Sequence, residues 1–400
     1  MGRVRGLFPA LASGTAFFDS PGGTQTPEPV VAAIAAALRA PLSNRGLGTP
    51  AARNADAIVH AARAALADFT GVDPRGVVFG RSATALTFEF ARTLSADWGP
   101  ADEVVVTRLD HDANVRPWVL AAEARGATVR MADFDPATGE LPPDAVTRHL
   151  STRTRLVAVT AASNLIGTQP DVAAIAAAAH AAGALVWVDG VHHAAHGRLN
   201  LPGLGADFLV CSPYKFFGPH LGVLVAAPER LEPLRPAKLL PSSEVVPERF
   251  ELGTLPYELL AGTTAAIDLL ADLVPGGDDR SDRLTRSQAA VAVHERVLRD
   301  RLEAGLDRLG ATRYSRAARR TSTVLFDLPG RPAAEVSTWL ADRDVNAPTG
   351  SFYAIETSRH LGLGDGGAVR VGLAAYSTEE EVDRLLGALG ALAAQPTGAA

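Results

Sequence analysis

The chain has 400 residues, 47% of them hydrophobic, with a formal net charge of −6 and a sequence pI near 5.9. This length and composition can bury a large core and would normally divide into two domains, and the acidic balance argues against nucleic acid or an acidic membrane surface as a partner. No apolar run reaches transmembrane length, and the N-terminus has no convincing cleavage site. The single cysteine, Cys211, excludes an internal disulfide. We therefore expect a cytoplasmic protein.

The first 70 residues predict an arm, a glycine turn and two helices. Residues 1–20 form a short arm, and Pro21-Gly-Gly-Thr-Gln25 is a turn whose glycines let the backbone approach a ligand or another subunit. Residues 27–39 and 51–70 have the periodicity of helices. The segment between them, Ser43-Asn-Arg-Gly-Leu-Gly48, has no periodicity and is interpreted as a loop.

Buried strands alternate with helices and turns in the next part of the chain. We predict strands at residues 76–79, 103–106, 128–132 and 156–160, and an alanine-rich helix at 172–182. This alternation is typical of an α/β protein with a parallel sheet.

Polar residues follow three of these strands. Gly80-Arg-Ser-Ala-Thr84 opens a helix, whose free N–H groups and dipole can bind a phosphate, although Ser and Thr are also ordinary N-caps. His111 follows the second strand and could equally be a capping or core histidine. Asn164 follows the fourth strand, where asparagine is also a common turn residue. The residues alone leave these three roles open.

The central stretch, residues 184–218, places two charges at the ends of consecutive strands. An apolar strand at 184–188 ends on Asp189, and a second buried strand at 207–211 leads to Lys215. Ligands of α/β folds bind at this carboxyl edge of the sheet. Pyridoxal 5′-phosphate (PLP) requires such a pair, since a lysine amine bonds to its aldehyde and a carboxylate keeps its pyridine nitrogen protonated. The alternative is an aspartate that caps a helix and a lysine on a solvated loop.

The last third of the chain predicts a helical region followed by a small α/β unit. The helical region spans about residues 257–309 and breaks around Pro275-Gly-Gly277, where we place a domain boundary. Alternating strands and helices follow at residues 323–328, 333–342, 369–373 and 378–392. Arg370 lies inside an apolar strand and needs an anionic partner, which is either a ligand carboxylate or a protein carboxylate in a structural ion pair.

These motifs resemble the class V aminotransferase family of fold-type I PLP enzymes, in its cysteine desulfurase-like and isopenicillin N epimerase-like branch. The resemblance extends from about Phe18 to the C-terminal helix. It implies an α/β fold with a mostly parallel seven-stranded sheet in a large domain and a small C-terminal α/β domain. We expect an arm at residues 1–20 that packs on the small domain, a PLP-binding domain at 21–276 and a small domain at 277–400.

The resemblance also implies a role for each candidate site residue. Lys215, His111 and Asp189 are the expected catalytic residues, with His111 stacked on the pyridine ring. The remaining expected cofactor contacts are Ala83, Thr84, Ser212, Tyr214 and Thr254 at the phosphate and Asn164 and His192 at the phenolic oxygen. The expected substrate contacts are Arg370, at the α-carboxylate, with Tyr353, Phe352 and Asn44.

Two further expectations concern partners and metals. The segment around Thr254 reaches the partner subunit's phosphate in the family, which implies a homodimer with shared active sites and a small amino acid as substrate. His192, His193 and His196 have no carboxylate or cysteine at a suitable spacing, so we expect no metal.

One position decides the predicted chemistry. Cysteine desulfurases attack the substrate sulfur with a cysteine on a small-domain loop, which corresponds here to residues 347–354 with Tyr353 near the cysteine position. Cys211 ends a buried strand and is expected to be a small hydrophobe. We therefore expect a C–S β-lyase on cysteine or an S-substituted cysteine, in specialised metabolism. The alternatives are an aminotransferase, epimerase or oxidative decarboxylase-deaminase on a similar amino acid, and a non-catalytic PLP-binding protein in sulfur trafficking.

Overall fold

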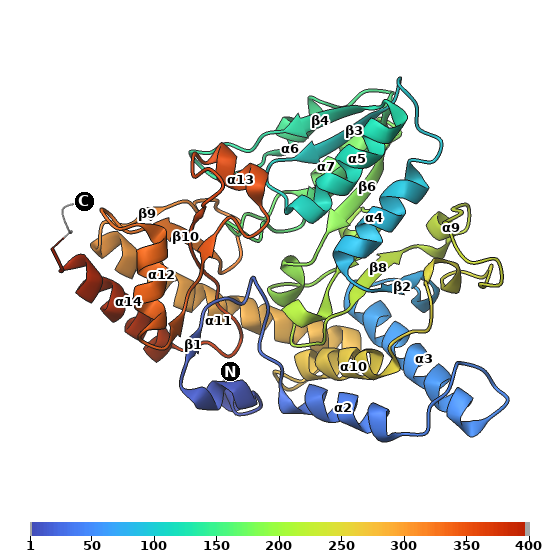
Figure 1. The fold of residues 1–400 in the computed structure, drawn as a ribbon, viewed down its shortest axis with the longest axis horizontal. Coiled ribbons are helices and arrows are strands. Elements are labelled where there is room, and N and C mark those ends of the chain that lie inside the picture. Colours follow the sequence, from blue (N-terminus) through green and yellow to red (C-terminus); the bar gives the residue numbers. More distant parts are fainter. Residues whose placement is uncertain (1, 397–400) are drawn as a thin grey trace.

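The largest sheet of the computed structural model, which describes residues 2–396, has seven strands in the order β2-β8-β7-β6-β5-β3-β4 (Figure 1). Its strands are β2 (Val77–Gly80), β3 (Glu103–Thr107), β4 (Thr128–Ala132), β5 (Thr154–Thr160), β6 (Leu185–Asp189), β7 (Phe208–Cys211) and β8 (Gly222–Ala226). Neighbouring strands pair in parallel except for β8, which is antiparallel to both β7 and β2. The predicted mostly parallel seven-stranded sheet is confirmed.

Helices cover both faces of this sheet, which explains why its strands are apolar throughout. Successive strand residues alternate between the faces, so Val104 and Val106 pack with Phe90 and Trp118 in one cluster, whereas Val105 belongs to the other. The first face is covered by α4 (Ala83–Leu94) and α5 (Arg116–Arg125), and the second by α3 (Pro50–Thr70), α7 (Val172–Ala181) and α10 (Tyr257–Ala271). The other helices of this part are α2 (Glu28–Arg39), α6 (Pro143–Thr147), α8 (Leu201–Leu204) and α9 (Pro228–Leu231).

The C-terminal part has its own sheet and core. Its four antiparallel strands lie in the order β12-β13-β10-β9, with β9 (Thr312–Arg313), β10 (Val324–Asp327), β12 (Thr349–Gly350) and β13 (Ala368–Val371). The helices are α11 (Arg280–Arg308), α12 (Ala333–Ala341), α13 (Ile355–His360) and α14 (Glu379–Ala393). Leu298 and Leu302 of α11 pack with Val324 and Phe326 of β10 in this core.

The N-terminal arm runs against the C-terminal part. It begins with α1 (Gly2–Arg5), and its strand β1 (Ala16–Phe17) pairs in parallel with β11 (Val345–Asn346). Phe18 is buried in the C-terminal core, and the Arg5 guanidinium pairs with Glu381 at 2.7 Å. The predicted domain boundaries at residues 20 and 276 stay predictions.

The predicted elements match the observed ones to within a few residues, with some omissions. The predicted break near Pro275 separates α10 from α11. The sequence did not predict α5, because Arg116, Glu123 and Arg125 interrupt its apolar positions. It also missed the two-residue strands β1, β9, β11 and β12 and the short helices α1, α6, α8, α9 and α13, which are too short to show a period.

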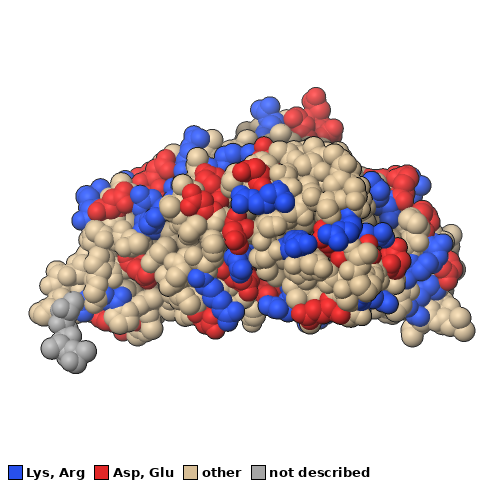
Figure 2. Space-filling view, turned by 90° about the horizontal axis from the view of Figure 1, so that it is seen from above, with Lys and Arg blue, Asp and Glu red and all other residues tan. Residues whose placement is uncertain are grey.

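The surface shown in Figure 2 carries acidic and basic side chains interspersed, in keeping with the small net charge of −6. Within residues 2–396, no helix combines the length and the apolar composition needed to cross a membrane. The cytoplasmic location stays a prediction.

Candidate active site

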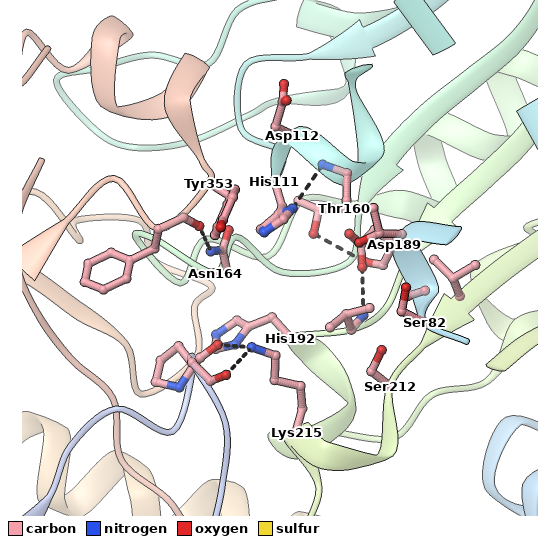
Figure 3. Close-up of a pocket in the computed structure, with 18 of the residues that line it drawn as sticks. Ser82, His111, Asp112, Thr160, Asn164, Asp189, His192, Ser212, Lys215 and Tyr353 are labelled. Carbon is pink, nitrogen blue, oxygen red and sulfur yellow. Dashed lines mark hydrogen bonds between the residues drawn. The ribbon is translucent and has the colours of Figure 1, made fainter. Parts of the chain in front are cut away.

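A cavity of about 590 Å³ opens at the carboxyl edge of the seven-stranded sheet, where the C-terminal part faces it (Figure 3). Its walls come from the ends of β5, β6 and β7, the N-terminus of α4, the loop after β12 and the turn after β1. It is lined by every predicted site residue except two: Ala83, Thr84, His111, Asn164, Asp189, His192, Ser212, Tyr214, Lys215, Phe352, Tyr353 and Arg370.

Asp189 and Lys215 bring a buried anion and a buried amine into this cavity. Asp189 ends β6, and its Oδ1 accepts a hydrogen bond from the Val191 N–H at 2.8 Å. Burial raises the pKa of Asp189 to about 6. Burial, together with the nearby positive charge of Arg370, lowers the pKa of Lys215 to about 7. Lys215 is only 8% exposed, so it does not lie on a solvated loop, and much of it is a neutral, nucleophilic amine near pH 7.

The turn after β1 contacts both Lys215 and Arg370. The Lys215 Nζ donates hydrogen bonds to the carbonyl oxygens of Pro21 and Gly22, the latter at 3.0 Å. The Arg370 guanidinium pairs with the Asp19 carboxylate at 2.5 Å. Sequence reasoning missed these acceptors, although it identified the glycine turn as a place of close backbone approach.

Arg370 therefore has a protein carboxylate as its partner and also faces the cavity. Its Nη1 donates to the Asn164 carbonyl oxygen at 3.2 Å, and its guanidinium carbon lies 3.5 Å from the centre of the Phe352 ring. Its Nε is buried without a hydrogen-bond partner among the described residues. Of the two alternatives that the sequence left open for Arg370, the structure shows the ion pair with a protein carboxylate. The unused Nε donor is compatible with a ligand carboxylate as well, and that role stays a prediction.

The N-terminus of α4, where a phosphate site is predicted, lies at the cavity. The Ser82 hydroxyl caps this 12-residue helix by accepting from the Ala85 N–H at 3.1 Å. Ala83 and Thr84 start the helix, where the N–H groups and the helix dipole attract an anion. Ser212 faces the cavity from the end of β7, so its hydroxyl can donate to the same anion.

His111 is held as a neutral imidazole. Its Nδ1 accepts a hydrogen bond from the Ala113 N–H at 3.0 Å, so Nε2 carries the hydrogen. Burial and the charges of Lys215 and Arg370 lower the pKa of His111 to about 4. Its ring lies 5.5 Å from the Tyr353 ring at an angle of 30°.

The loop after β12 closes the cavity from the C-terminal part. Phe352 and Tyr353 both have left-handed backbones, with φ of 49° and 61°. This conformation is held by two contacts from the large sheet, because the Asn164 Nδ2 donates to the Phe352 carbonyl at 2.9 Å and the Asp112 N–H donates to the Tyr353 carbonyl at 2.7 Å. The Tyr353 side chain remains 77% exposed at the mouth.

Two predicted residues lie outside this cavity. Thr254 lines a separate pocket together with Phe79, Arg81 and His220, and Asn44 lines neither. The resemblance placed Thr254 at the active site of a second subunit, so contacts within one chain do not bring it there. Their roles stay predictions.

Cys211 faces away from the cavity. Val210 and Ser212 line it, and strand alternation points the side chain between them to the opposite face, where Cys211 is fully buried in the apolar core. Burial raises the pKa of the Cys211 thiol to about 12. The thiol is therefore neither accessible nor nucleophilic here.

The residues of the cavity fit PLP. Asp189 uses one oxygen for the Val191 N–H and has a second for a pyridine N–H. The Asn164 Nδ2 uses one hydrogen for the Phe352 carbonyl and has a second that can donate to the phenolic oxygen. The α4 N-terminus suits the phosphate. The amine of Lys215, with its lowered pKa, suits the aldehyde.

Comparison with known proteins gives a consistent picture. The family model Aminotransferase class-V matches residues 16–385. An uncharacterised protein of Mycobacterium tuberculosis is 37% identical over 98% of both chains, and a probable cysteine desulfurase of Pseudomonas putida is 30% identical over 96% of both. The apo structure of a cysteine desulfurase from Thermococcus onnurineus superposes with a TM-score of 0.89 at 25% identity, covering 98% of this chain and 97% of the other.

Proposed function

Because the chain belongs to the class V aminotransferase family and is a PLP-dependent enzyme, we propose that it is a C–S β-lyase acting on cysteine or an S-substituted cysteine. The position of the cysteine is the observation that carries this proposal. A desulfurase needs a thiolate beside the substrate sulfur, but Cys211 is buried on the far face of β7 and Tyr353 stands on the loop at the mouth. Without a thiol to accept it, the sulfur leaves from Cβ with its substituent.

The side chains of the cavity have different roles in the proposed reaction. Arg370 binds and orients the substrate α-carboxylate, and Lys215, as a neutral amine, takes the proton from the α-carbon. PLP, when bound, supplies the electron sink for the charge that develops at that carbon. Asp189 keeps the ring nitrogen protonated, and His111 covers the ring face. Tyr353 and Phe352 bound the space beyond Cβ, where a substituent on sulfur would lie.

We also propose that two copies of the chain share their active sites. The segment before Thr254 exposes large apolar side chains, since Leu239, Leu240, Val245 and Leu252 are each at least 59% exposed. Such exposure is typical of an interface between chains. A second copy would cover this segment and bring Thr254 to the neighbouring phosphate site. Light scattering that gives a single-chain mass of 41.6 kDa for the active enzyme would contradict this.

The alternatives use the same groups and differ in their products. An aminotransferase, epimerase or oxidative decarboxylase would also need Lys215, Asp189 and Arg370. A non-catalytic PLP-binding protein would not need a lysine of lowered pKa together with a buried carboxylate-binding arginine, so the site favours catalysis.

Product analysis tests the proposal. Purified holoenzyme is incubated with L-cysteine and a panel of S-substituted cysteines, and the products are identified by mass spectrometry. The proposal expects pyruvate, ammonia and a free thiol. Alanine with an enzyme-bound persulfide would show a desulfurase, and a keto acid or aldehyde that keeps its sulfur would support the alternatives.

A further inference from the structure

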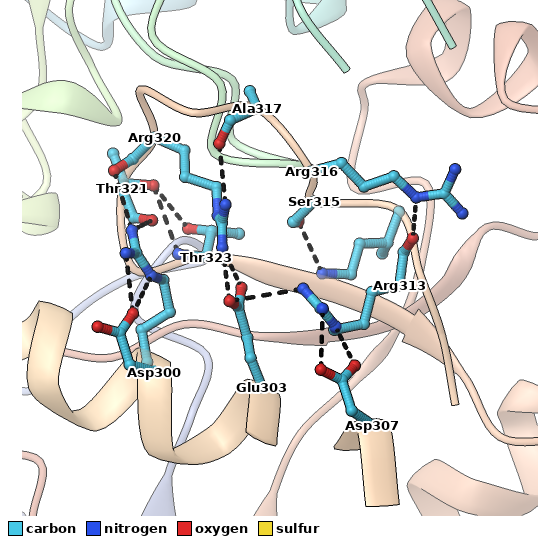
Figure 4. A network of polar contacts seen from close by, with 12 residues as sticks. Asp300, Glu303, Asp307, Arg313, Ser315, Arg316, Ala317, Arg320, Thr321 and Thr323 are labelled. Atoms are coloured by element: carbon cyan, nitrogen blue, oxygen red, sulfur yellow. Dashed lines mark hydrogen bonds and ion pairs between the residues drawn. The ribbon is translucent and has the colours of Figure 1, made fainter. Parts of the chain in front are cut away.

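The segment between β9 and β10, residues 314–323, crosses from the C-terminal sheet to the edge of the seven-stranded sheet (Figure 4). We call it the strap. Two backbone hydrogen bonds join it to the loop after β5, from the Gln169 N–H to the Arg319 carbonyl and from the Thr321 N–H to the Gly167 carbonyl, both at 2.9 Å. The strap is therefore fixed against the part of the chain that carries the cofactor site.

Ion pairs with α11 hold the other side of the strap (Figure 4). Arg320 contacts both carboxylate oxygens of Glu303, and Arg313, in β9, pairs with Asp307 at 2.8 Å. Arg320 and Glu303 are mostly buried, with side chains 11% and 13% exposed. Anchors on both sides give the side chains at the end of the strap defined positions.

Two hydroxyls at this end contact one nitrogen of His192. The His192 Nε2 lies 3.1 Å from the Thr321 Oγ1 and 3.0 Å from the Thr323 Oγ1, and these two oxygens are 3.2 Å apart. All three residues are buried. Gly167 allows this approach, because a Cβ there would lie 2.9 Å from the Thr321 Oγ1 and its φ is 76°.

Counting hydrogens decides which nitrogen of His192 is protonated. If Nε2 accepts, the Thr323 hydroxyl donates to Nε2 and the Thr321 hydroxyl donates to the Thr323 oxygen, so both buried hydroxyl hydrogens have acceptors. The ring hydrogen then lies on Nδ1, which is not among the fully buried side-chain atoms without a partner in the described residues. If Nε2 carries the hydrogen, one hydroxyl hydrogen is left without an acceptor. An unsatisfied buried donor costs about 1–3 kcal/mol, so the first arrangement is favoured. Burial also lowers the pKa of His192 well below its usual value, which keeps the ring neutral.

We propose that Thr321 and Thr323 are positioning residues that fix His192 as the tautomer protonated on Nδ1. His192 lines the active-site cavity, and no described residue hydrogen-bonds to its Nδ1. The strap thereby presents a hydrogen-bond donor, which suits an anionic oxygen of the bound cofactor. The inference rests on the assignment as a PLP enzyme and does not depend on C–S bond cleavage.

The test removes both hydroxyls while keeping the side-chain shape, in the holoenzyme Thr321→Val/Thr323→Val. A donor to a cofactor oxygen stabilises the more anionic form, so its loss should raise the pH midpoint of the absorbance change of bound PLP by about half a unit to one unit. The ring carbons of ¹³C-labelled histidine, observed by NMR, report the tautomer directly. The wild-type His192 should show the Nδ1–H form.

Three controls distinguish the effect of the threonine hydroxyls on His192 from a general effect of substitution on packing. Thr168→Val removes a buried hydroxyl that donates to the Gly139 carbonyl at 2.7 Å, and should leave the midpoint unchanged. Thr321→Ser/Thr323→Ser keeps both hydroxyls and should resemble the wild type. In a His192→Phe background, the valine substitutions should have no further effect on the midpoint. An Nε2–H tautomer in the wild type, an unmoved midpoint in the valine variant, or an equal shift in either the serine or the Thr168 control would overturn the proposal.

Discussion

The two walls of the active-site cavity are built in different ways. The wall from the large sheet places Asp189 and Ser212 at the ends of buried strands and Thr84 at a helix N-terminus. The opposite wall includes Arg370 of β13, the turn at Asp19 and the loop at Phe352, while the strap contacts His192 without lining the cavity. The first wall fits the cofactor, and the second carries Arg370, which we propose binds the substrate. Elements of the large sheet thus form one wall, and the N-terminal arm and the C-terminal part form the other.

Removing Lys215 from the first wall should have the largest effect. Lys215→Ala loses both the amine that bonds to the cofactor and the base that takes the α-proton, so we expect turnover to fall by about 10³-fold or more. The measurement is the rate of product formation. Lys238, the only other lysine of the sequence, pairs with Glu244 outside the cavity and is the alternative site for a covalent label. Borohydride reduction followed by peptide mass spectrometry should place the cofactor on Lys215, and a label elsewhere would contradict the assignment.

Removing the arginine from the second wall should weaken substrate binding. Arg370→Met loses a charge-assisted contact to the substrate α-carboxylate, and we expect kcat/KM to fall by about 100-fold, mostly through KM. Bound PLP should keep its absorbance spectrum, because Arg370 belongs to the wall that does not hold the cofactor. If Arg370→Met lost the absorbance of bound PLP and kept the wild-type KM, Arg370 would hold the cofactor and not the substrate.

The burial of Lys215 should also appear in the pH dependence of stability. Its pKa of about 7 in the folded chain is below its usual value of 10.5, so between these values the unfolded chain binds one more proton at this site. The contribution of Lys215 to the free energy of unfolding should therefore rise with pH from about 7 to 10, by about 1.4 kcal/mol per unit, and be lost as pH falls through 7. The difference between the wild-type and Lys215→Met apoproteins, measured by urea unfolding, isolates this effect. A difference that is flat over this range would show that the amine is charged in the folded state.

The sequence predicted the first wall well because its signals are local. Asp189 ends an unbroken apolar strand, and Lys215 follows the next one, so the strand pattern alone locates both. Ala83 and Thr84 begin a helix directly after a strand. Such patterns occupy only a few consecutive residues, and they can be interpreted without knowing the rest of the fold.

The second wall depends on contacts between distant parts of the chain. Thr321 and Thr323 look like ordinary residues beside a strand until the fold brings them to His192. Asp19 lies in an irregular arm with no periodicity. The resemblance assigned Thr254 to the active site of another copy, which contacts within one chain do not supply.

The smallest effect should come from a substitution of Asp19. It tests how the charge of Asp19 affects the binding of the substrate carboxylate at Arg370. Asp19 pairs with Arg370, so a substrate α-carboxylate that approaches the guanidinium meets a like charge. Asp19→Asn keeps an oxygen that can accept from Arg370 but removes this charge, and we expect KM to fall by about threefold with kcat unchanged. Asp133 provides the control, because it pairs with Arg108 away from the cavity, and Asp133→Asn should leave KM unchanged. If KM rises instead in Asp19→Asn, the carboxylate serves to orient Arg370 toward the substrate, and the pairing seen here persists in the complex.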